Sequence, residues 1–355
     1  MRVLALICMC CAVFFSEKKP APYQYPTLSF FPSIPHNQQN RITEEGVLLG
    51  KTLFFDPVLS LDSSLSCGSC HRPEAAFSDA GNALSRGVGE AIGKRNSPGL
   101  FNLVWENHLF WDGRASSLEE QALEPVRNVH EMNTDWSEVE QRINNHSVYP
   151  RLFENVFPDQ HIDSMLIAMA LAQFERSLIS YNSKYDSVLR GEAYFTKTEL
   201  AGYNLANDQV NGGCVHCHNF DTNPLTTTGR FSNNGLDRLH NDKGLANHTQ
   251  DIRHQGQFSI PSIRNLSFTA PYMHDGRFES LDEVLDFYSK GVQISESIDP
   301  NMTEAQKGGM HFSEEEKNQL KAFLHTLNDF EFVKKASALR GTNSSLPTAP
   351  RTRDR

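Results

Sequence analysis

Cysteine is scarce in this chain, and its few copies are grouped. Of seven cysteines in 355 residues, three lie within the first sixteen positions, and four lie in two copies of one pattern, CGSCH at 67–71 and CVHCH at 214–218. No cysteine remains for a structural disulfide, which excludes a disulfide-stabilised scaffold. The repeated pattern instead indicates a chemical role for the four.

The sequence also lacks an excess of positive charge. Its formal net charge is −10, and no long block of one sign interrupts it. A general nucleic-acid binder would need a basic face, so no nucleic-acid partner is expected. Beyond the N-terminus there is no apolar run long enough to span a bilayer.

The N-terminus reads MRVLALICMCCAVFFSEKKP, in which one arginine precedes an apolar run from Val3 to Phe15. The run is short for a membrane span and typical of a secretory signal, so residues 1–16 are predicted to be a signal peptide and the protein to be exported. Its cysteines would allow lipid attachment, although no lipobox is visible. The alternative is a retained, membrane-proximal N-terminus.

Few runs alternate with period two, and helical periodicity dominates, which predicts a mainly α fold. Residues 43–54 and 162–179 are expected to be helical. A third helix is expected from Ser313, with Glu316 placed to complete a capping box. Residues 17–40 are rich in Pro, Asn and Gln and read as a linker or an extended wrap.

An internal repeat divides the chain. Residues 97–125 and 260–288 align at one constant offset, and both contain an Asp-Gly-Arg and a Ser-Leu step. We therefore expect two related domains, 41–188 and 189–338, each with one cysteine pattern. The Ser, Thr, Pro and Arg-rich tail, 339–355, is expected to be disordered.

Cys-x-x-Cys-His is the attachment pattern of c-type haem. The two thiols form thioethers with the haem, and the adjacent histidine binds the iron. A thioredoxin-type pair would need a βαβ context, which is missing, and a zinc site would need both patterns to meet. We therefore predict two covalent haem c groups, with His71 and His218 as iron ligands. The attachment cysteines are Cys67, Cys70, Cys214 and Cys217.

The repeat predicts unequal haem faces. Position 125 is Pro, which has no ligating side chain, and the aligned position is Tyr288, whose phenol can bind iron. One haem would then be open to a small oxidant and the other capped for electron transfer. The alternative for Tyr288 is a packed helix aromatic.

Three more residues follow from this interpretation. Glu131 could carry a proton from one peroxide oxygen to the other, with Gln121 as a polar neighbour, and Trp111 could relay electrons between the haems. The alternatives are a loop carboxylate for Glu131 and an ordinary core aromatic for Trp111.

With these motifs, the chain resembles the bacterial di-haem cytochrome c peroxidase family. The likeness runs from about residue 41 to 335, through LFFDPVLSLDSSLSCGSCHRPEAAFSD, RNSP, LFWDGRASSLEEQALEPV, HEM, GCVHCH, IPSIRNLSFTAPYMHDGRF and TLNDF. The resemblance implies two cytochrome c-like domains, with a peroxidatic haem on the first and an electron-transfer haem on the second.

The resemblance also implies residue roles. Glu131 matches the catalytic glutamate, Gln121 and Pro125 match the distal pocket, and Trp111 matches the tryptophan between the haems. An interdomain calcium ion is implied at Asn96, Thr269 and Pro271.

Two departures from the typical peroxidases matter. The loop before RNSP has Val88 where a blocking histidine is usual, so the first haem is expected to be open without reductive activation. Tyr288 replaces the usual methionine, and an anionic oxygen ligand favours ferric and higher states. Both departures are shared with the subgroup that resembles the methylamine-utilisation di-haem enzyme.

We therefore expect a periplasmic di-haem peroxidase that reduces hydrogen peroxide to water with electrons from a small c-type cytochrome or another periplasmic donor. An alternative enzyme would use peroxide-derived oxidising equivalents on a protein or organic substrate. A third alternative is a plain electron carrier. The resemblance favours a homodimer.

Overall fold

The structure is a computed structural model that describes residues 19–208, 213–221, 223–302 and 308–340. The expected signal peptide, 1–16, lies outside the described residues, as does the expected tail from residue 341 onward. Within the described ranges, no helix is both long and apolar enough to cross a membrane.

Helices joined by long loops make up the described chain, which confirms the expected mainly α class. The one sheet within the described ranges is a two-stranded antiparallel pair, β1 (Phe231–Ser232) with β2 (Phe258–Ser259). The helices are α1 (Glu44–Phe55), α2 (Cys67–Cys70), α3 (Leu118–Arg127), α4 (Trp136–Asn144), α5 (Tyr149–Val156), α6 (Ser164–Ser177), α7 (Lys184–Leu189), α8 (Lys197–Ala206), α9 (Val215–His218), α10 (Ala246–Thr249), α11 (Leu281–Asp286), α12 (Glu314–Thr326) and α13 (Phe330–Ser337).

Local caps decide where the expected helices begin. The Thr43 hydroxyl accepts the Gly46 N–H at the start of α1. At α12 the Ser313 hydroxyl accepts the Glu316 N–H, and the Glu316 carboxylate accepts the Ser313 N–H. Each cap satisfies helix N–H groups that have no partner within the helix. All three helices expected from the sequence are confirmed, within two residues at each predicted N-terminus.

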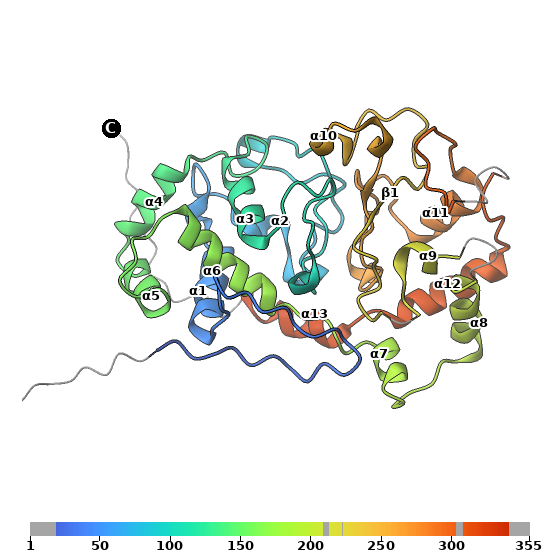
Figure 1. Ribbon diagram of the computed structural model, residues 1–355, viewed down its shortest axis with the longest axis horizontal. Coiled ribbons are helices and arrows are strands. Elements are labelled where there is room, and N and C mark those ends of the chain that lie inside the picture. The colour runs from blue at the N-terminus through green and yellow to red at the C-terminus, as the bar shows by residue number, and fades with distance from the viewer. Residues whose placement is uncertain (1–18, 209–212, 222, 303–307, 341–355) are drawn as a thin grey trace, which may run out of the picture.

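The buried apolar side chains gather in two main clusters. The larger lies between α1, α3, α5 and α6 and includes Phe54, Phe77 and Phe174. The smaller lies around Phe323 of α12, between α7, α8 and α9. Figure 1 shows the corresponding groups of helices side by side, and we call residues 44–179 the N-terminal half and 184–328 the C-terminal half.

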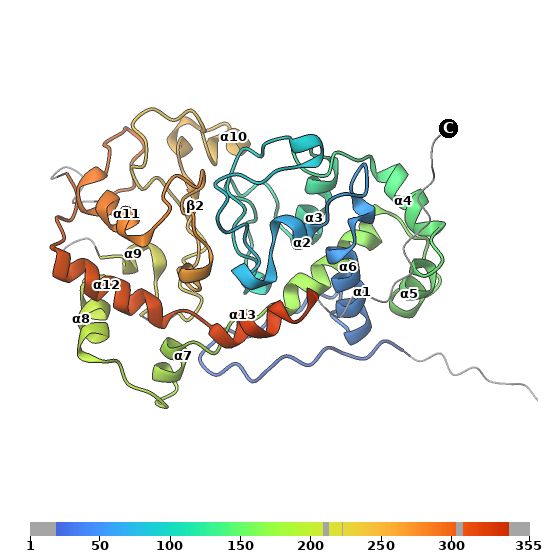
Figure 2. The same ribbon diagram turned by 180° about the vertical axis from the view of Figure 1, so that it is seen from behind.

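Two segments far apart in sequence tie the halves together. Helix α13 runs back from the C-terminal half, and Phe332 packs against the Phe77 and Phe101 rings of the larger cluster. The extended segment 19–43 runs beside it (Figure 2). In that segment the Phe31 ring lies 5.6 Å from the Trp105 ring of the N-terminal half, and the Arg264 guanidinium of the C-terminal half lies 5.7 Å from the centre of the Phe31 ring. Both halves are therefore held by chain that crosses between them.

The repeat is visible in the backbone. Isolated bridges close the matching turns 109–115 and 272–278. Just before them, Asn102 and Asn265 take the same left-handed conformation, each with φ 60°. These equivalent turns project equivalent stretches of chain toward the junction between the halves.

Candidate functional site

A single connected cavity of about 970 Å³ extends through the junction of the halves. This volume lies at the upper end of the about 300–1,000 Å³ that is usual for ligand sites. Its wall brings together every site residue that the sequence singled out. These are Cys67, Cys70, His71, Asn96, Trp111, Gln121, Pro125, Glu131, Cys214, Cys217, His218, Thr269, Pro271 and Tyr288.

The first cysteine pattern is a single helical turn. Helix α2 spans its two cysteines, and His71 follows as the C-cap. The His71 Nδ1 lies 2.8 Å from the Phe77 carbonyl oxygen. Because a carbonyl can only accept, Nδ1 carries the proton and Nε2 keeps its lone pair. Burial lowers the pKa of His71, which keeps the ring neutral and suited to bind a metal.

The second pattern repeats this arrangement. The His218 Nδ1 lies 3.0 Å from the Pro261 carbonyl oxygen, which again leaves Nε2 as the free ring nitrogen. Burial lowers the pKa of His218 to about 4. Each half therefore presents one neutral, oriented imidazole and two thiols to the cavity.

The thiols themselves are not set up for redox exchange. None of the four forms a disulfide. Burial raises the pKa of Cys70 and of Cys214 to about 11, whereas a reactive pair needs a lowered thiol pKa. Within the described ranges, no three His, Cys, Asp or Glu side chains converge as a zinc site would require.

On the first pattern's side of the cavity, the wall carries Glu131, Gln121 and Pro125. The Asn128 amide donates to the Glu131 Oε1 at 2.6 Å. Burial raises the pKa of Glu131, against the opposing effects of this hydrogen bond and of the Arg114 charge. Such a carboxyl gives up and takes back its proton at a higher pH than an exposed glutamate does.

On the second pattern's side, Tyr288 lies on the wall within a π-helical turn, Phe287–Gly291. The Asn234 amide donates to its phenolic oxygen at 3.1 Å. Burial raises the pKa of Tyr288 to about 12. Its ring also packs 4.8 Å from the Phe287 ring, so the residue has an apolar contact as well as a cavity-facing oxygen.

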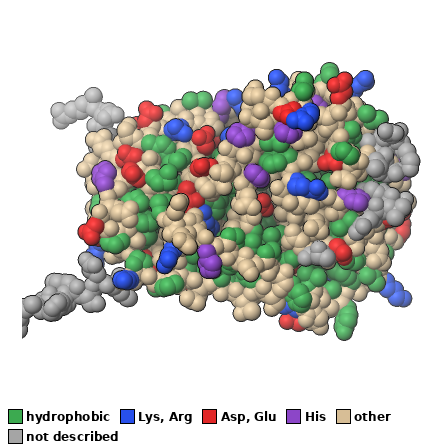
Figure 3. Space-filling model, in the orientation of Figure 1, with side chains coloured by type: hydrophobic (Ala, Val, Ile, Leu, Met, Phe, Trp, Pro, Cys, Tyr) green, Lys and Arg blue, Asp and Glu red, His purple; other side chains and the backbone are tan. Residues whose placement is uncertain are grey.

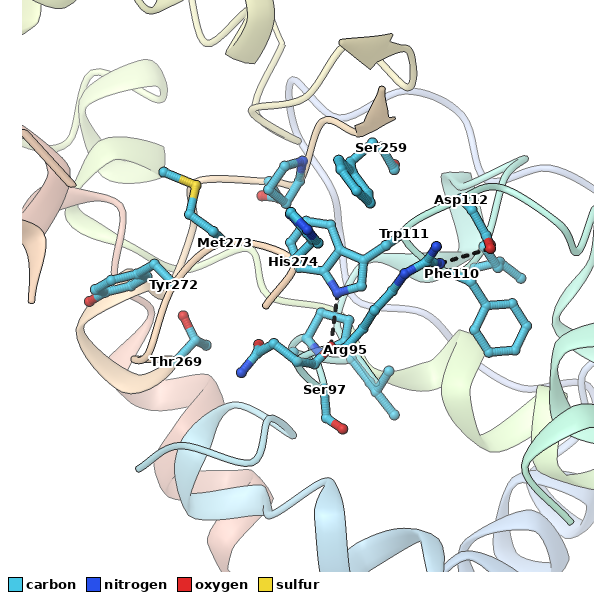
Figure 4. A pocket seen from close by; sticks show the side chains of 18 of the residues that line it. Arg95, Ser97, Phe110, Trp111, Asp112, Ser259, Thr269, Tyr272, Met273 and His274 are labelled. Atoms are coloured by element: carbon cyan, nitrogen blue, oxygen red, sulfur yellow. Dashed lines mark hydrogen bonds and ion pairs between the residues drawn. The ribbon is translucent and has the colours of Figure 1, made fainter. Parts of the chain in front are cut away.

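Trp111 lies at the junction itself (Figure 4). Its indole N–H donates to the Asn96 carbonyl oxygen at 2.8 Å. Its own carbonyl accepts the Ser259 N–H from β2 at 2.8 Å. The Asn96 N–H in turn donates to the His274 carbonyl oxygen at 2.8 Å. Trp111 is therefore held by hydrogen bonds to main-chain atoms of both halves, Asn96 in one and Ser259 in the other.

The three residues expected at a calcium site are brought close through one loop. The Asn96 amide donates to the carbonyl oxygens of Asn82 and Ala83 at 3.3 and 3.1 Å. The neighbouring Gly81 N–H donates to the Ala270 carbonyl oxygen at 2.8 Å, between Thr269 and Pro271. The acceptor end of the Asn96 amide and main-chain carbonyls are oxygen donors of the kind that Ca²⁺ prefers.

Comparison with known proteins agrees with this geometry. Residues 44–194 match the family model described as di-haem cytochrome c peroxidase. The methylamine utilization protein MauG of Methylophilus methylotrophus is 34% identical over 297 residues, 83% of this chain and 86% of that protein. The cytochrome-c peroxidase IdrP1 of Pseudomonas sp. (strain SCT) is 32% identical, over 92% of each chain. The chain belongs to the di-haem cytochrome c peroxidase family.

A solved MauG-like protein associated with microbial copper homeostasis has the same fold, with a TM-score of 0.79 and 31% identity over 88% of this chain and 97% of that one. Members of the di-haem peroxidase family are oxidoreductases, and the family implies two c-type haems. The residues present fit two such groups, because each half offers a thiol pair and an imidazole Nε2 to one large cavity.

The loop that contains Val88 lies against the side of the cavity that carries the first cysteine pattern. The Val88 N–H donates to the Glu131 carbonyl oxygen at 2.8 Å, and Gly87 lies on the cavity wall. The loop therefore supports the Glu131 backbone.

Sequence reasoning missed two further groups in the cavity wall. Arg95 and Asp242 form an ion pair across the junction, with a shortest distance of 2.7 Å. Glu175 of α6 is buried, and its Oε2 has no hydrogen-bond partner within the described part of the chain. Arg95 directly precedes Asn96 in the RNSP motif, so the sequence offered a reason to consider it as a site residue. Asp242 and Glu175 lie outside every motif, so the sequence offered no such reason for them.

Proposed function

We propose that this protein is a periplasmic di-haem peroxidase that reduces hydrogen peroxide to water, consuming protons and the electrons of a small c-type cytochrome or another periplasmic donor. The observation that carries the proposal is the contrast between the two sides of the cavity. One side carries the partly buried Glu131 carboxyl and Pro125, and the other carries the Tyr288 oxygen.

Cys67, Cys70 and His71 would hold one haem c, and Cys214, Cys217 and His218 the other. Bound there, the haem iron supplies the redox chemistry that peroxide reduction needs. Tyr288 would supply a further protein ligand to the haem of the C-terminal half. Pro125 at the matching position would leave the N-terminal face accessible to peroxide, without a histidine at Val88 to block it.

The protein's own part in the reaction is proton transfer and positioning. Glu131 would take the proton from the peroxide oxygen nearest to it and deliver it to the other oxygen, which leaves as water. Asn128 holds one carboxylate oxygen at 2.6 Å and so aims the other. Gln121, also on the wall, would orient the peroxide.

Electrons would enter through the C-terminal half and reach the N-terminal half by way of Trp111. Asn96, Thr269 and Pro271 would hold a calcium ion that stiffens this junction. We propose two cytochrome c-like domains, 41–188 and 189–338, each with one cysteine pattern. Export by the segment 1–16 and a homodimer remain part of the proposal.

The second candidate function is oxidation of a protein or organic substrate with peroxide-derived equivalents. The tyrosine at 288 and the likeness to MauG proteins favour it. Steady-state oxidation of a reduced c-type cytochrome by peroxide supports peroxide reduction, and its absence together with a long-lived oxidised state of the protein supports the alternative. A plain electron carrier would show two six-coordinate haems and no spectral response to cyanide.

The decisive test is Glu131→Gln in the purified holoprotein. Turnover of peroxide should fall by about 10²- to 10⁴-fold, the usual worth of a positioned acid–base group, while both haems stay bound. The matched control is Glu124→Gln on the exposed side of α3, which should leave turnover unchanged above the acid limb, because it removes only a small upward effect of the Glu124 charge on the pKa of Glu131.

The pH profile gives an independent check. The active form of Glu131 is the carboxylate, and burial raises its pKa. Turnover should therefore be lost as the pH falls through that raised pKa, above the usual range of a glutamate. Undiminished turnover in Glu131→Gln, or an acid limb that persists in it, would remove Glu131 from the mechanism.

A further inference from the structure

Two consecutive residues of one loop are bonded to two consecutive residues of another at the junction. Asn96 accepts the Trp111 indole N–H at 2.8 Å. The residue before Asn96 is Arg95, and its Nη1 lies 2.7 Å from the Oδ2 of Asp112. Asp112 directly follows Trp111 in the sequence. Figure 4 shows the Arg95 side chain running beside the indole toward Asp112. The guanidinium is thus placed beside Trp111 by a double contact.

Arg95 also reaches the C-terminal half. Its Nε and Nη2 donate to the two carboxylate oxygens of Asp242 at 2.7 and 2.8 Å, a bidentate pairing that fixes direction as well as distance. All three guanidinium nitrogens of Arg95 are therefore paired with a carboxylate, that of Asp112 in the N-terminal half or that of Asp242 in the C-terminal half. The Asp242 Oδ1 also accepts the Gly244 N–H at 3.0 Å and the Asn247 amide at 3.2 Å, which anchors its own loop.

A stack of rings supports the guanidinium on the C-terminal side. Arg95 lies 5.6 Å from the centre of the Phe258 ring. That ring is stacked on His274, with centroids 3.7 Å apart and planes at 13°. His274 is the residue whose carbonyl holds the Asn96 N–H. The contacts of Arg95 and Asn96 therefore form one connected group around Trp111.

The charges of this group balance, and the group is partly shielded from water. The side chains of Arg95, Asp112 and Asp242 are 16, 8 and 28% exposed. Arg114 also pairs with Asp112 at 2.9 Å, so two cations meet two carboxylates. Burial lowers the pKa of His274, which keeps that ring neutral. Partly buried charges are screened less than exposed ones, so removing one changes the local field.

We propose that Arg95 and Asp242 form a clamp that positions Trp111 for electron transfer between the two halves and balances the charge beside its indole. The inference rests on the proposed function, in which hydrogen peroxide is the final oxidant. Each electron that the indole gives to the N-terminal site is replaced by one from the C-terminal site, so Trp111 is unchanged overall. While the electron is absent the indole is electron-poor, and an unbalanced guanidinium would oppose that state.

The test is Asp242→Asn. Asparagine has the same shape, so its Oδ1 can still accept the Gly244 N–H, and Arg95 keeps Asp112. The change therefore removes one charge and one arm of the clamp and leaves the rest. The matched control is Asp237→Asn. Asp237 forms a similar bidentate pair with Arg277, and in the variant Arg277 would still be paired with a second carboxylate, that of Asp275. That pair lies within the C-terminal half.

The measurement is rapid mixing of the reduced holoprotein with hydrogen peroxide, following the absorbance of the C-terminal haem as it loses its electron. In Asp242→Asn the rate constant should fall about tenfold, within the hundredfold that a displacement of about 1 Å can cost. Asp237→Asn should stay within twofold of the wild type, and Asp242→Glu should recover most of the rate. Hydrogen exchange in peptides covering 92–98 and 240–247 should rise only in Asp242→Asn.

The outcomes separate the two proposals. If peroxide does not oxidise the wild-type C-terminal haem at all, the proposed function fails, and the clamp has no electron transfer to support. If the wild type reacts and Asp242→Asn reacts equally fast, or slows no more than Asp237→Asn, the clamp is refuted. If Asp242→Asn does not fold, a slow Asp242→Glu with unchanged ferric spectra would refute it too.

Discussion

Glu175 offers a prediction about stability whose size follows from the structure. Its side chain is only 6% exposed, and its Oε2 has no hydrogen-bond partner among the described residues. Burial raises the pKa of Glu175 to about 8, with Arg176 opposing and Glu119 adding to the shift. The folded protein therefore holds a proton that the unfolded chain releases near pH 4.5, and folding becomes less favourable as the pH rises between these values.

The magnitude follows from 1.36 kcal/mol for each unit of pKa difference. At pH 7 the cost of Glu175 reaches at most about 3 kcal/mol, and at pH 5 it stays below about 1 kcal/mol. Glu175→Gln has nearly the same shape and no charge to lose. The same relation gives at most about 4 kcal/mol at pH 8, and the buried amide of Gln offsets part of this by about 1–3 kcal/mol. The variant should therefore match the wild type near pH 5 and exceed its free energy of unfolding by about 1–3 kcal/mol at pH 8.

Urea unfolding of the holoprotein at pH 5 and pH 8 measures the difference. Glu119→Gln is the matched control, because Glu119 accepts both Arg176 Nη groups, at 2.6 and 2.8 Å. These bonds and that of Asn40 hold the pKa of Glu119 low despite its burial. Its removal should destabilise the protein at pH 8 by about 3 kcal/mol. A Glu175→Gln variant that gains nothing at pH 8, or gains equally at both pH values, would refute the reasoning.

Two further predictions concern the C-terminal ligand and the junction. Tyr288→Phe should shift the low-spin spectrum of the C-terminal haem. Tyr272 also lies on the cavity wall, and Tyr272→Phe should leave that spectrum unchanged. If the spectra of Tyr288→Phe and the wild type are identical, the assignment of Tyr288 as a ligand is wrong. Gly113→Ala should cost more than the about 1–2 kcal/mol of a left-handed alanine, because its Cβ would overlap the Phe231 ring across the junction. Gly81→Ala is the control, because Gly81 has φ +87° and open space around it, so this variant should lose only the stability that a left-handed alanine costs. If thermal unfolding shows equal losses of stability in the two variants, the predicted overlap between the residue 113 Cβ and the Phe231 ring is wrong.

On the face in Figure 3, acidic and basic side chains are interspersed with polar and apolar ones. A donor protein that binds there would have to rely on shape and on small patches, since a broad field of one sign is what steers strongly charged partners.

The sequence was informative wherever the controlling interaction is short-range. The caps at Thr43 and Ser313 act within three residues, so the starts of α1 and α12 could be predicted. The cysteine patterns carry their chemistry within five residues. Aligning the repeat placed Pro125 and Tyr288 at matching positions, and both lie on the cavity wall.

Other features depend on contacts between distant parts of the chain. Helix α13 follows the C-terminal half in sequence, yet Phe332 packs in the N-terminal cluster, because that cluster has an apolar surface left to cover. Nothing in the pattern of α6 distinguishes Glu175 from a surface carboxylate. Its isolation depends on which side chains the neighbouring helices place around it.

The sequence alone therefore determined the helical class, the two attachment patterns and the identity of the residues around them, since each is written in a few neighbouring positions. Only the tertiary structure decided that these residues share one cavity, and that Arg95 and Asp242, far apart in the chain, hold the junction beside Trp111. The reason is that a charge pair across two halves has no local periodicity or spacing, and exists only once packing has fixed both loops.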